Sequence, residues 1–179
     1  MNFGMPYMGS KNTIATSIVN MLPNGTRIVD LFGGGGAITC CSLYLHKYKK
    51  VLYNELNPLC EKLFEDAING KYNEKIFIPE FITREDFNNH KNDDGYVKYI
   101  WSFGNNGSEY MFSKENENIK HIAHDYVVFN RWNEYLSQFI DKKTLIGETI
   151  HDRKMEFKKM INNKKQPLNN NISQLERLS

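Results

Sequence analysis

The sequence has few cysteines, no long hydrophobic run and no N-terminal targeting pattern. Its 179 residues include only three cysteines, Cys40, Cys41 and Cys60, and no C-x-x-C pair. An odd number of cysteines, two of them adjacent in the sequence, argues against a disulfide framework or a zinc ribbon, and indicates a reducing compartment. No apolar stretch approaches the roughly 18 residues of a membrane-spanning helix. The first residues lack the basic and apolar segments of a signal peptide. The length suits one domain, or one domain with an appendage.

Charge is nearly balanced over the chain but is unevenly spread. Residues 1–110 contain 11 basic and 12 acidic side chains, whereas residues 111–179 contain 12 and 9. Within residues 142–165 the numbers are 8 and 3. A basic second half fits contact with phosphates, and it equally fits a solvated helix surface.

The first half of the chain alternates between helix-like and strand-like segments. Apolar residues at helical spacing predict a helix over residues 11–21, with Ser10 or Asn12 as its cap. Runs rich in β-branched residues predict buried strands over residues 28–32 and 51–54.

A glycine loop and two further helices complete this pattern. Residues 33–36 are all glycine and predict a loop, and residues 37–48 predict a helix. Pro58 fits the first turn of another helix that ends near residues 69–70. Strand, loop, helix and strand in succession predict a βαβ unit with a parallel sheet, and therefore an α/β fold.

The pattern weakens after residue 75, and the expected elements there are mostly helical. They are a strand over residues 96–103, a loop over 104–107, helices over 113–137 and 152–165, and the start of a last helix with Ile172, Leu175 and Leu178.

The glycine loop and two acidic residues indicate a ligand site. Asp30 precedes the loop, which lies at the carboxyl end of the first strand, where open α/β sheets bind ligands. Glu55 follows the second strand about twenty residues later, where an acidic residue accepts hydrogen bonds from both hydroxyls of a ribose.

Three interpretations of this loop are open. A dinucleotide requires a third glycine at the G-x-G-x-x-G spacing, but those positions hold Thr39 or Cys41. S-adenosylmethionine needs no third glycine, and its sulfonium and ammonium groups suit Asp30, so the pattern favours it. The third interpretation is a purely structural glycine turn with an exposed capping acid at Glu55.

Four segments carry motifs, namely residues 5–11, 30–37, 53–58 and 101–106. In order and spacing, the first three resemble motifs of the Dam-like DNA adenine N6-methyltransferases of bacteria and phages. These motifs are an aromatic-x-Gly-x-Lys segment, an Asp/Glu-x-Phe-x-Gly-x-Gly cofactor loop and an acidic-x-Asn ribose motif. The fourth resembles a block of the phage members. The resemblance covers residues 3–110 well and the rest loosely.

The resemblance implies a Rossmann-like, S-adenosylmethionine-dependent methyltransferase fold with an incomplete sheet. Residues 1–110 would be a partial cofactor-binding core. Residues 111–179 would be a truncated, basic and mostly helical region that recognises the target in double-stranded DNA. The expected location is the cytoplasm of a bacterial cell, with a bacterial, phage or prophage gene.

The resemblance also implies roles for individual residues. Tyr7 and Lys11 would contact the methionine part of S-adenosylmethionine, and Asp30 would hold its amino group. The wall of the site and the ribose contacts would come from Phe32, Gly34, Gly36, Glu55 and Asn57.

The catalytic motif of the family, Asp-Pro-Pro-Tyr, is absent from the sequence. The five prolines are never adjacent. In the family, the Asp side chain and the proline carbonyl accept hydrogen bonds from the adenine amine. The resemblance therefore implies an enzyme truncated before this motif and inactive alone, with a second chain as the source of the catalytic half. The alternative is a catalytically dead relic that still binds S-adenosylmethionine or DNA.

Several other groups of residues allow two interpretations. His121, His124 and Asp125 could hold a metal, but their helical spacing favours an exposed polar face and no metal. Trp101, Phe103, Tyr110 and Phe112 could stack on bases, but such aromatics are more often core residues. The candidate DNA-binding residues are Arg131, Lys142, Lys143, Arg153, Lys154, Lys158 and Lys159, followed by Lys164 and Lys165.

Overall fold

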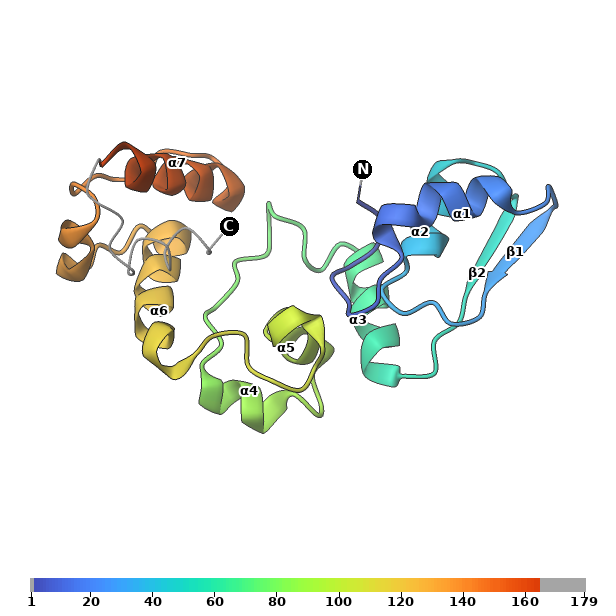
Figure 1. Ribbon diagram of the computed structural model, residues 1–179, viewed down its shortest axis with the longest axis horizontal. Coiled ribbons are helices and arrows are strands. Elements are labelled where there is room, and N and C mark those ends of the chain that lie inside the picture. Colours follow the sequence, from blue (N-terminus) through green and yellow to red (C-terminus); the bar gives the residue numbers. More distant parts are fainter. Residues whose placement is uncertain (1, 165–179) are drawn as a thin grey trace. The chain divides into compact units, whose positions relative to one another are not determined.

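The computed structural model describes residues 2–164, and the chain divides into two compact units (Figure 1). The first unit contains the chain up to Tyr72 together with Arg84–Met111. The second unit contains Asn73–Thr83 and the chain from Phe112 onward. Neither unit is therefore formed by one continuous stretch of chain.

The first unit begins with the predicted alternation of helices and strands. Its elements are η1 (Asn12–Ile14), α1 (Ala15–Met21), β1 (Arg27–Asp30), α2 (Ala37–Tyr44), β2 (Lys50–Tyr53) and α3 (Pro58–Ile68). Helix α1 packs on α2 through the buried side chains of Ala15, Val19 and Cys41.

Two predicted details of these helices are wrong. Neither Ser10 nor Asn12 caps α1, because the Oδ1 atom of Asn12 accepts a hydrogen bond from the Phe3 N–H instead (2.6 Å). Helix α2 ends before residue 48, because His46 adopts a left-handed backbone conformation with φ = 51°.

Strands β1 and β2 pair in parallel, as the βαβ pattern predicts, with Ile28 opposite Val51 and Val29 opposite Leu52. Side chains alternate between the two faces of the sheet. The face with Ile28 and Val51 is partly buried, whereas Val29 and Leu52 are each 41% exposed on the other face. The two strands thus leave one apolar face open to solvent, so the prediction that they are buried is wrong for this face, and β1 ends at Asp30, before the predicted residue 32.

Helix α3 begins as predicted at residues 57–58. The Oδ1 atom of Asn57 accepts hydrogen bonds from the backbone N–H groups of Leu59 (3.1 Å) and Cys60 (3.4 Å), and Pro58 occupies the first turn. This cap satisfies N–H groups that a helix start leaves without intrahelical partners.

The strand predicted over residues 96–103 is wrong, because most of this segment forms α5 (Gly95–Ile100). The Asp94 side chain caps α5 by accepting hydrogen bonds from Tyr96 N–H (2.7 Å) and Val97 N–H (3.2 Å). A Cβ on Gly95 would lie 2.2 Å from the Leu59 carbonyl oxygen, so glycine lets α5 approach α3 closely. Capping and packing thus outweigh the strand propensity of the aromatic residues.

Three shorter features surround α5. Helix α4 (Arg84–His90), which the sequence pattern does not indicate, precedes it. Ser102 then pairs with Tyr110 in an isolated antiparallel bridge. The predicted loop at 104–107 begins within η2 (Phe103–Asn105), a short 3-10 turn.

The second unit is helical in its described part. It consists of α6 (Lys114–Phe129), η3 (Glu134–Gln138) and α7 (Ile150–Asn163). Tyr126 from α6, Leu136 from η3 and Phe157 from α7 meet in one hydrophobic core. Lys165 and the predicted last helix with Ile172, Leu175 and Leu178 lie outside the described residues.

The helix predicted over residues 113–137 ends early, at Phe129. Asn130 adopts a left-handed conformation with φ = 55°. Its side chain accepts a hydrogen bond from Leu145 N–H (2.8 Å) and donates one to the Leu145 carbonyl (3.0 Å). This contact spans 15 residues and clamps the chain after α6.

Helix α7 begins two residues before its predicted start. Thr149 and Asp152 form a reciprocal capping box, in which the Thr149 Oγ1 accepts a hydrogen bond from the Asp152 N–H (3.0 Å). Within residues 2–164, no helix combines the length and hydrophobicity needed to cross a membrane.

The Asn130 clamp yields a stability prediction. Asn130→Ala should destabilise the second unit by about 1–3 kcal/mol, because the buried backbone groups of Leu145 lose their partners. Native-state hydrogen exchange should show faster exchange in α6 and α7, with α3 as an internal control. Asn130→Gly removes the left-handed strain as well as the hydrogen bonds. Wild-type exchange rates in Asn130→Gly would contradict a stabilising role for the hydrogen bonds.

Candidate functional site

The glycine loop between β1 and α2 is fixed by backbone hydrogen bonds. Gly33 N–H donates to the Asn54 carbonyl (2.9 Å), and Gly36 N–H donates to the Gly33 carbonyl (2.8 Å). Met5 N–H donates to the Gly35 carbonyl (2.8 Å), which attaches the N-terminal segment to the loop. The loop therefore joins the ends of both strands to the first of the sequence motifs.

Glycine is required at position 36 by conformation and by packing. The residue has φ = 75°, which side chains with a Cβ rarely adopt, and it caps α2. A Cβ would lie 2.1 Å from the Cε2 atom of Phe64, which is buried and stacks on Tyr53. At least part of the glycine run therefore serves the packing of the loop itself.

The Glu55 carboxylate bridges the glycine loop and the start of α3. Its Oε2 atom accepts a hydrogen bond from Gly34 N–H (2.8 Å), and its Oε1 atom accepts one from Asn57 N–H (2.9 Å). A carboxylate oxygen has more than one acceptor position, so both oxygens can accept further hydrogen bonds. Glu55 is thus a fixed acceptor at the carboxyl ends of the strands, rather than an exposed capping acid.

Asp30 is held by the first turn of α2. Its Oδ2 atom accepts hydrogen bonds from the Thr39 hydroxyl (2.8 Å) and the Thr39 N–H (3.2 Å). A carboxylate near a helix N-terminus is favoured by the helix dipole. Thr39, whose buried hydroxyl group fixes the orientation of Asp30, was not predicted as a site residue from the sequence.

The carbonyl group of Gly34 is hydrogen bonded to two side chains of the first unit. It accepts hydrogen bonds from the Tyr53 hydroxyl (2.8 Å) and the Cys60 thiol (3.3 Å). Burial, with the nearby charge of Glu55 as a further cause, raises the pKa of Cys60 to about 11. The thiol therefore remains a neutral donor near pH 7.

Tyr99 is a second residue of this region that the sequence motifs do not indicate. It is buried, its hydroxyl accepts a hydrogen bond from Asn57 Nδ2 (2.8 Å), and its ring centroid lies 5.1 Å from that of Tyr7. Burial raises the pKa of its phenol to about 12. Tyr99 therefore links Asn57, whose backbone N–H donates to Glu55, to Tyr7 of the N-terminal motif.

The structure brings some of the predicted cofactor residues together and leaves others apart. Tyr7 packs beside Gly34, where a Cβ would lie 3.2 Å from its ring. Phe32 is 91% exposed, and the Lys11 Nζ donates only to the Gly9 carbonyl (2.7 Å) among the described residues. Tyr7, Asp30, Gly34, Gly36, Glu55 and Asn57 thus belong to the bonded loop region, whereas Lys11 and Phe32 extend into solvent.

A family model of the D12 class N6 adenine-specific DNA methyltransferases matches residues 7–177. The chain belongs to this family. The matched region begins at Tyr7 and includes the glycine loop, Glu55 and the basic second half. Searches of curated proteins and of solved structures each gave no match.

Membership in the D12 class identifies the general chemistry of the family. The family consists of S-adenosylmethionine-dependent enzymes that methylate adenine in DNA. The match is consistent with the α/β character of the first unit, in which two parallel strands lie among helices.

In this D12-class chain, three of the predicted DNA-binding lysines are engaged in ion pairs, including Lys164, whose Nζ lies 3.3 Å from Asp141. Lys143 Nζ lies 2.6 Å from Glu156, whose other oxygen accepts a hydrogen bond from Ile146 N–H (2.9 Å). The hydrogen bond from Lys143 is the largest cause that lowers the pKa of Glu156. Lys142 lies 4.0 Å from Glu134. Lys143 thus contributes to a contact that joins the chain before α7 to the helix itself.

The basic residues of α7 have no such partners. Arg153, Lys154, Lys158 and Lys159 form no ion pair with other residues in the range 2–164. Lys154 and Lys158 lie one helical turn apart, and the pKa of Lys154 is lowered by burial and then by Lys158. Uncompensated positive charges on one helix are available to anionic groups such as phosphates.

The histidine group that allowed a metal interpretation forms contacts with an acid. His121 Nε2 and His124 Nδ1 each lie 3.8 Å from Asp125 Oδ1. Burial lowers the pKa of His124. In residues 2–164, no three His, Cys, Asp or Glu side chains form a group suited to a metal ion.

The packing at Gly36 yields a second prediction. Gly36→Ala and Gly70→Ala both place a Cβ at positive φ, but only Gly36→Ala clashes, because the space around Gly70 is open. Gly70→Ala should cost about 1 kcal/mol for the strained backbone, and Gly36→Ala should cost about 2 kcal/mol more because Phe64 must move. Chemical denaturation of the two variants measures the difference. Equal losses would show that Phe64 adapts to the extra atom without cost.

Proposed function

We propose that this chain binds S-adenosylmethionine at the glycine loop of a Rossmann-like first unit and double-stranded DNA through its second unit. Its function is that of a DNA adenine N6-methyltransferase whose transfer step requires residues that this sequence lacks. The observation that supports the cofactor site most directly is the Glu55 carboxylate, which two N–H groups fix at the carboxyl ends of parallel strands.

The side chains around Glu55 fit the groups of this cofactor. Leu31 and Phe32 after β1, and Leu56 after β2, are exposed apolar residues that suit a purine ring and a methylated sulfur. Glu55 has acceptor positions left for the ribose hydroxyls. S-adenosylmethionine supplies the methyl group on a positively charged sulfur, which a site with two carboxylates favours.

Each proposed cofactor residue has a physical role. Gly34 and Gly36 let the backbone form the wall of the site, and Tyr7 supports Gly34 from the side. Asp30 contributes its negative charge to the site, and its hydrogen bonds with Thr39 fix the first turn of α2 next to the loop. Lys11 and Phe32 are the exposed members of this set. When the ligand is bound, Lys11 contacts its methionine part and Phe32 completes the wall of the site.

In the second unit, we propose that DNA contacts the basic residues that form no ion pair within residues 2–164, and that the phosphates face those on α7. These are Arg131 after α6 and Arg153, Lys154, Lys158 and Lys159 on α7. Lys142 and Lys143 contribute less, since each already faces a carboxylate. A positive side chain without an ion-pair partner gains more binding free energy from a phosphate than one that is already paired.

Methyl transfer has an additional requirement that this chain does not meet alone. The exocyclic amine of adenine is a weak nucleophile, and acceptors must hold its hydrogens while the base is extruded from the duplex. The family provides them with Asp-Pro-Pro-Tyr, and no two prolines are adjacent in this sequence. We therefore propose that a second chain carries this motif. The exposed face of the sheet at Val29 and Leu52 supports such a partner.

A catalytically dead relic is the alternative to a two-chain enzyme. It would keep cofactor or DNA binding without transfer. A neighbouring reading frame that encodes an Asp-Pro-Pro-Tyr motif would favour the enzyme. The bacterial cytoplasm stays the predicted location in both cases.

Cofactor binding is tested by titration calorimetry with S-adenosylmethionine. The wild type should bind it, and Glu55→Gln should weaken binding tenfold or more, about 1.4 kcal/mol, because charged acceptors form the stronger hydrogen bonds. Glu61→Ala, which removes an exposed acid from the first turn of α3, is the matched control and should bind like the wild type.

Two results would contradict this assignment. A folded wild type that binds a nicotinamide dinucleotide and ignores S-adenosylmethionine would restore the dinucleotide interpretation. A Glu55→Gln variant with lower thermal stability but unchanged affinity would show that Glu55 only joins the glycine loop to α3 and does not contact the cofactor.

The transfer step is tested with S-adenosylmethionine labelled in its methyl group and unmethylated duplex DNA. The chain alone should transfer no label, because nothing in its sequence supplies the acceptor pair for the adenine amine. A family member that contains Asp-Pro-Pro-Tyr serves as the positive control. Label on DNA after incubation with this chain alone would refute the need for a second chain.

A further inference from the structure

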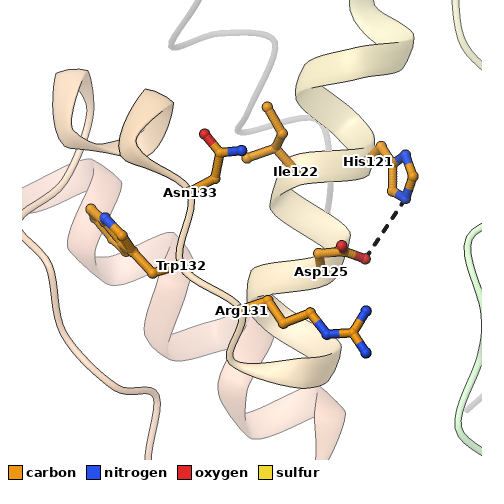
Figure 2. Close-up of a pocket in the computed structure, with 6 residues that line it drawn as sticks. All are labelled: His121, Ile122, Asp125, Arg131, Trp132 and Asn133. Atoms are coloured by element: carbon orange, nitrogen blue, oxygen red, sulfur yellow. Dashed lines mark ion pairs between the residues drawn. The ribbon is translucent and has the colours of Figure 1, made fainter.

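An open pocket of about 260 Å³ lies in the second unit beside the end of α6 (Figure 2). It is lined by His121, Ile122, Asp125, Arg131, Trp132 and Asn133. The first three come from α6, and the others follow directly after the helix. The pocket thus combines a carboxylate, a guanidinium group and an indole ring on one small surface.

The clamp at Asn130 determines where the second half of the pocket lies. The left-handed conformation of Asn130 turns the chain out of α6, and its two hydrogen bonds to Leu145 hold that turn. Arg131 N–H then donates to the backbone carbonyl of Asp125 (3.2 Å). The backbone of Arg131 is therefore attached to the same helical turn that carries the Asp125 side chain.

Arg131 presents an unused fork of donors. Its guanidinium carbon lies 4.6 Å from the ring centroid of Phe129. Within residues 2–164, the group forms neither an ion pair nor a side-chain hydrogen bond. In Figure 2 the Arg131 guanidinium and the Asp125 carboxylate extend to the same side of α6.

Asp125 provides an acceptor next to this donor fork. Its side chain is 30% exposed, and its Oδ1 atom lies 3.8 Å from the imidazoles of both His121 and His124. That separation is too long for a hydrogen bond. The carboxylate can therefore accept a hydrogen bond from an amino group in a ligand.

The two parallel N–H donors of Arg131 beside the acceptor Asp125 match a G·C base pair better than an A·T base pair. In the major groove, a G·C pair presents two acceptors, guanine N7 and O6, followed by the amino donor of cytosine N4. An A·T pair places the adenine amino donor where the second N–H of arginine would point. A phosphate offers acceptors alone, so it leaves Asp125 unsatisfied and is repelled by its charge.

We propose that Arg131 and Asp125 read a G·C base pair in the DNA substrate. Arg131 donates two hydrogen bonds to guanine O6 and N7, and Asp125 accepts one from cytosine N4. The inference rests on the proposed function, because it requires that the second unit binds duplex DNA. It assigns sequence reading to the end of α6 and leaves phosphate contact to α7.

The test begins with selection of preferred duplexes from a pool with randomised positions, followed by affinity measurements on single duplexes. In the wild type, changing the recognised G·C pair to A·T should weaken binding about tenfold. Replacing that guanine with 7-deazaguanine, which lacks the N7 acceptor, should also weaken binding. Arg131→Lys keeps the charge but loses the planar fork, so it should bind both duplexes nearly equally.

Two further variants separate base reading from other roles. Asp125→Asn replaces an acceptor by an amide that can also donate, and should reduce the preference for the G·C pair. Lys159→Ala loses a positive charge from the exposed surface of α7, and should weaken binding to all sequences equally. Circular dichroism and titration with S-adenosylmethionine verify that each variant is folded.

The outcomes distinguish this inference from the proposed function. If the wild type prefers G·C and Arg131→Lys retains that preference, the base-reading role is refuted while DNA binding stands. If Arg131→Lys and 7-deazaguanine change nothing and Arg131→Ala weakens all sequences equally, Arg131 is a phosphate contact. If the wild type binds no duplex at all, both the inference and the DNA part of the proposed function are refuted.

Discussion

The bridge formed by the Glu55 carboxylate is the interaction on which the first unit depends. One oxygen fixes the glycine loop through Gly34, and the other fixes the start of α3 through Asn57. Asn57 in turn caps α3 and donates to Tyr99, whose ring packs against Tyr7. Three motifs that are far apart in the sequence are therefore joined by hydrogen bonds and ring contacts that begin at one side chain. A charged acceptor suits this position because its hydrogen bonds are stronger than neutral ones.

Local rules predicted the βαβ part of the fold because its signals are local. The strand-like runs, the glycine run and the helix start at Pro58 each act within a few residues, and the structure confirms these elements, although the strands are more exposed than predicted. The failures occur where distant contacts decide the outcome. A helix replaces the strand expected over residues 96–103 because Gly95 permits close contact with α3. The helix after residue 113 ends early because Asn130 bonds to Leu145.

The candidate site shows the same division between local and distant information. The motifs contain Tyr7, Gly34 and Glu55, and the structure places these residues in one bonded region. Tyr99 lies 42 residues beyond Asn57, in a segment interpreted as a strand, so no spacing rule associates the two. Thr39 was considered only as a missing glycine, although its hydroxyl orients Asp30. Both omissions concern residues that position a predicted site residue.

In both units, hydrogen bonds of one side chain, Glu55 or Asn130, fix a loop or turn next to a polar group. This arrangement serves ligand binding and does not depend on the catalytic motif. In the first unit, Glu55 fixes a loop without using all of its acceptor positions. In the second, Asn130 fixes a turn and leaves the Arg131 guanidinium without an ion pair in residues 2–164. Each clamp thus holds an unused polar group in place before a ligand arrives, which lowers the entropy lost on binding. Pre-organised binding needs no acceptor for the adenine amine, so a chain without Asp-Pro-Pro-Tyr can keep both of the proposed binding surfaces.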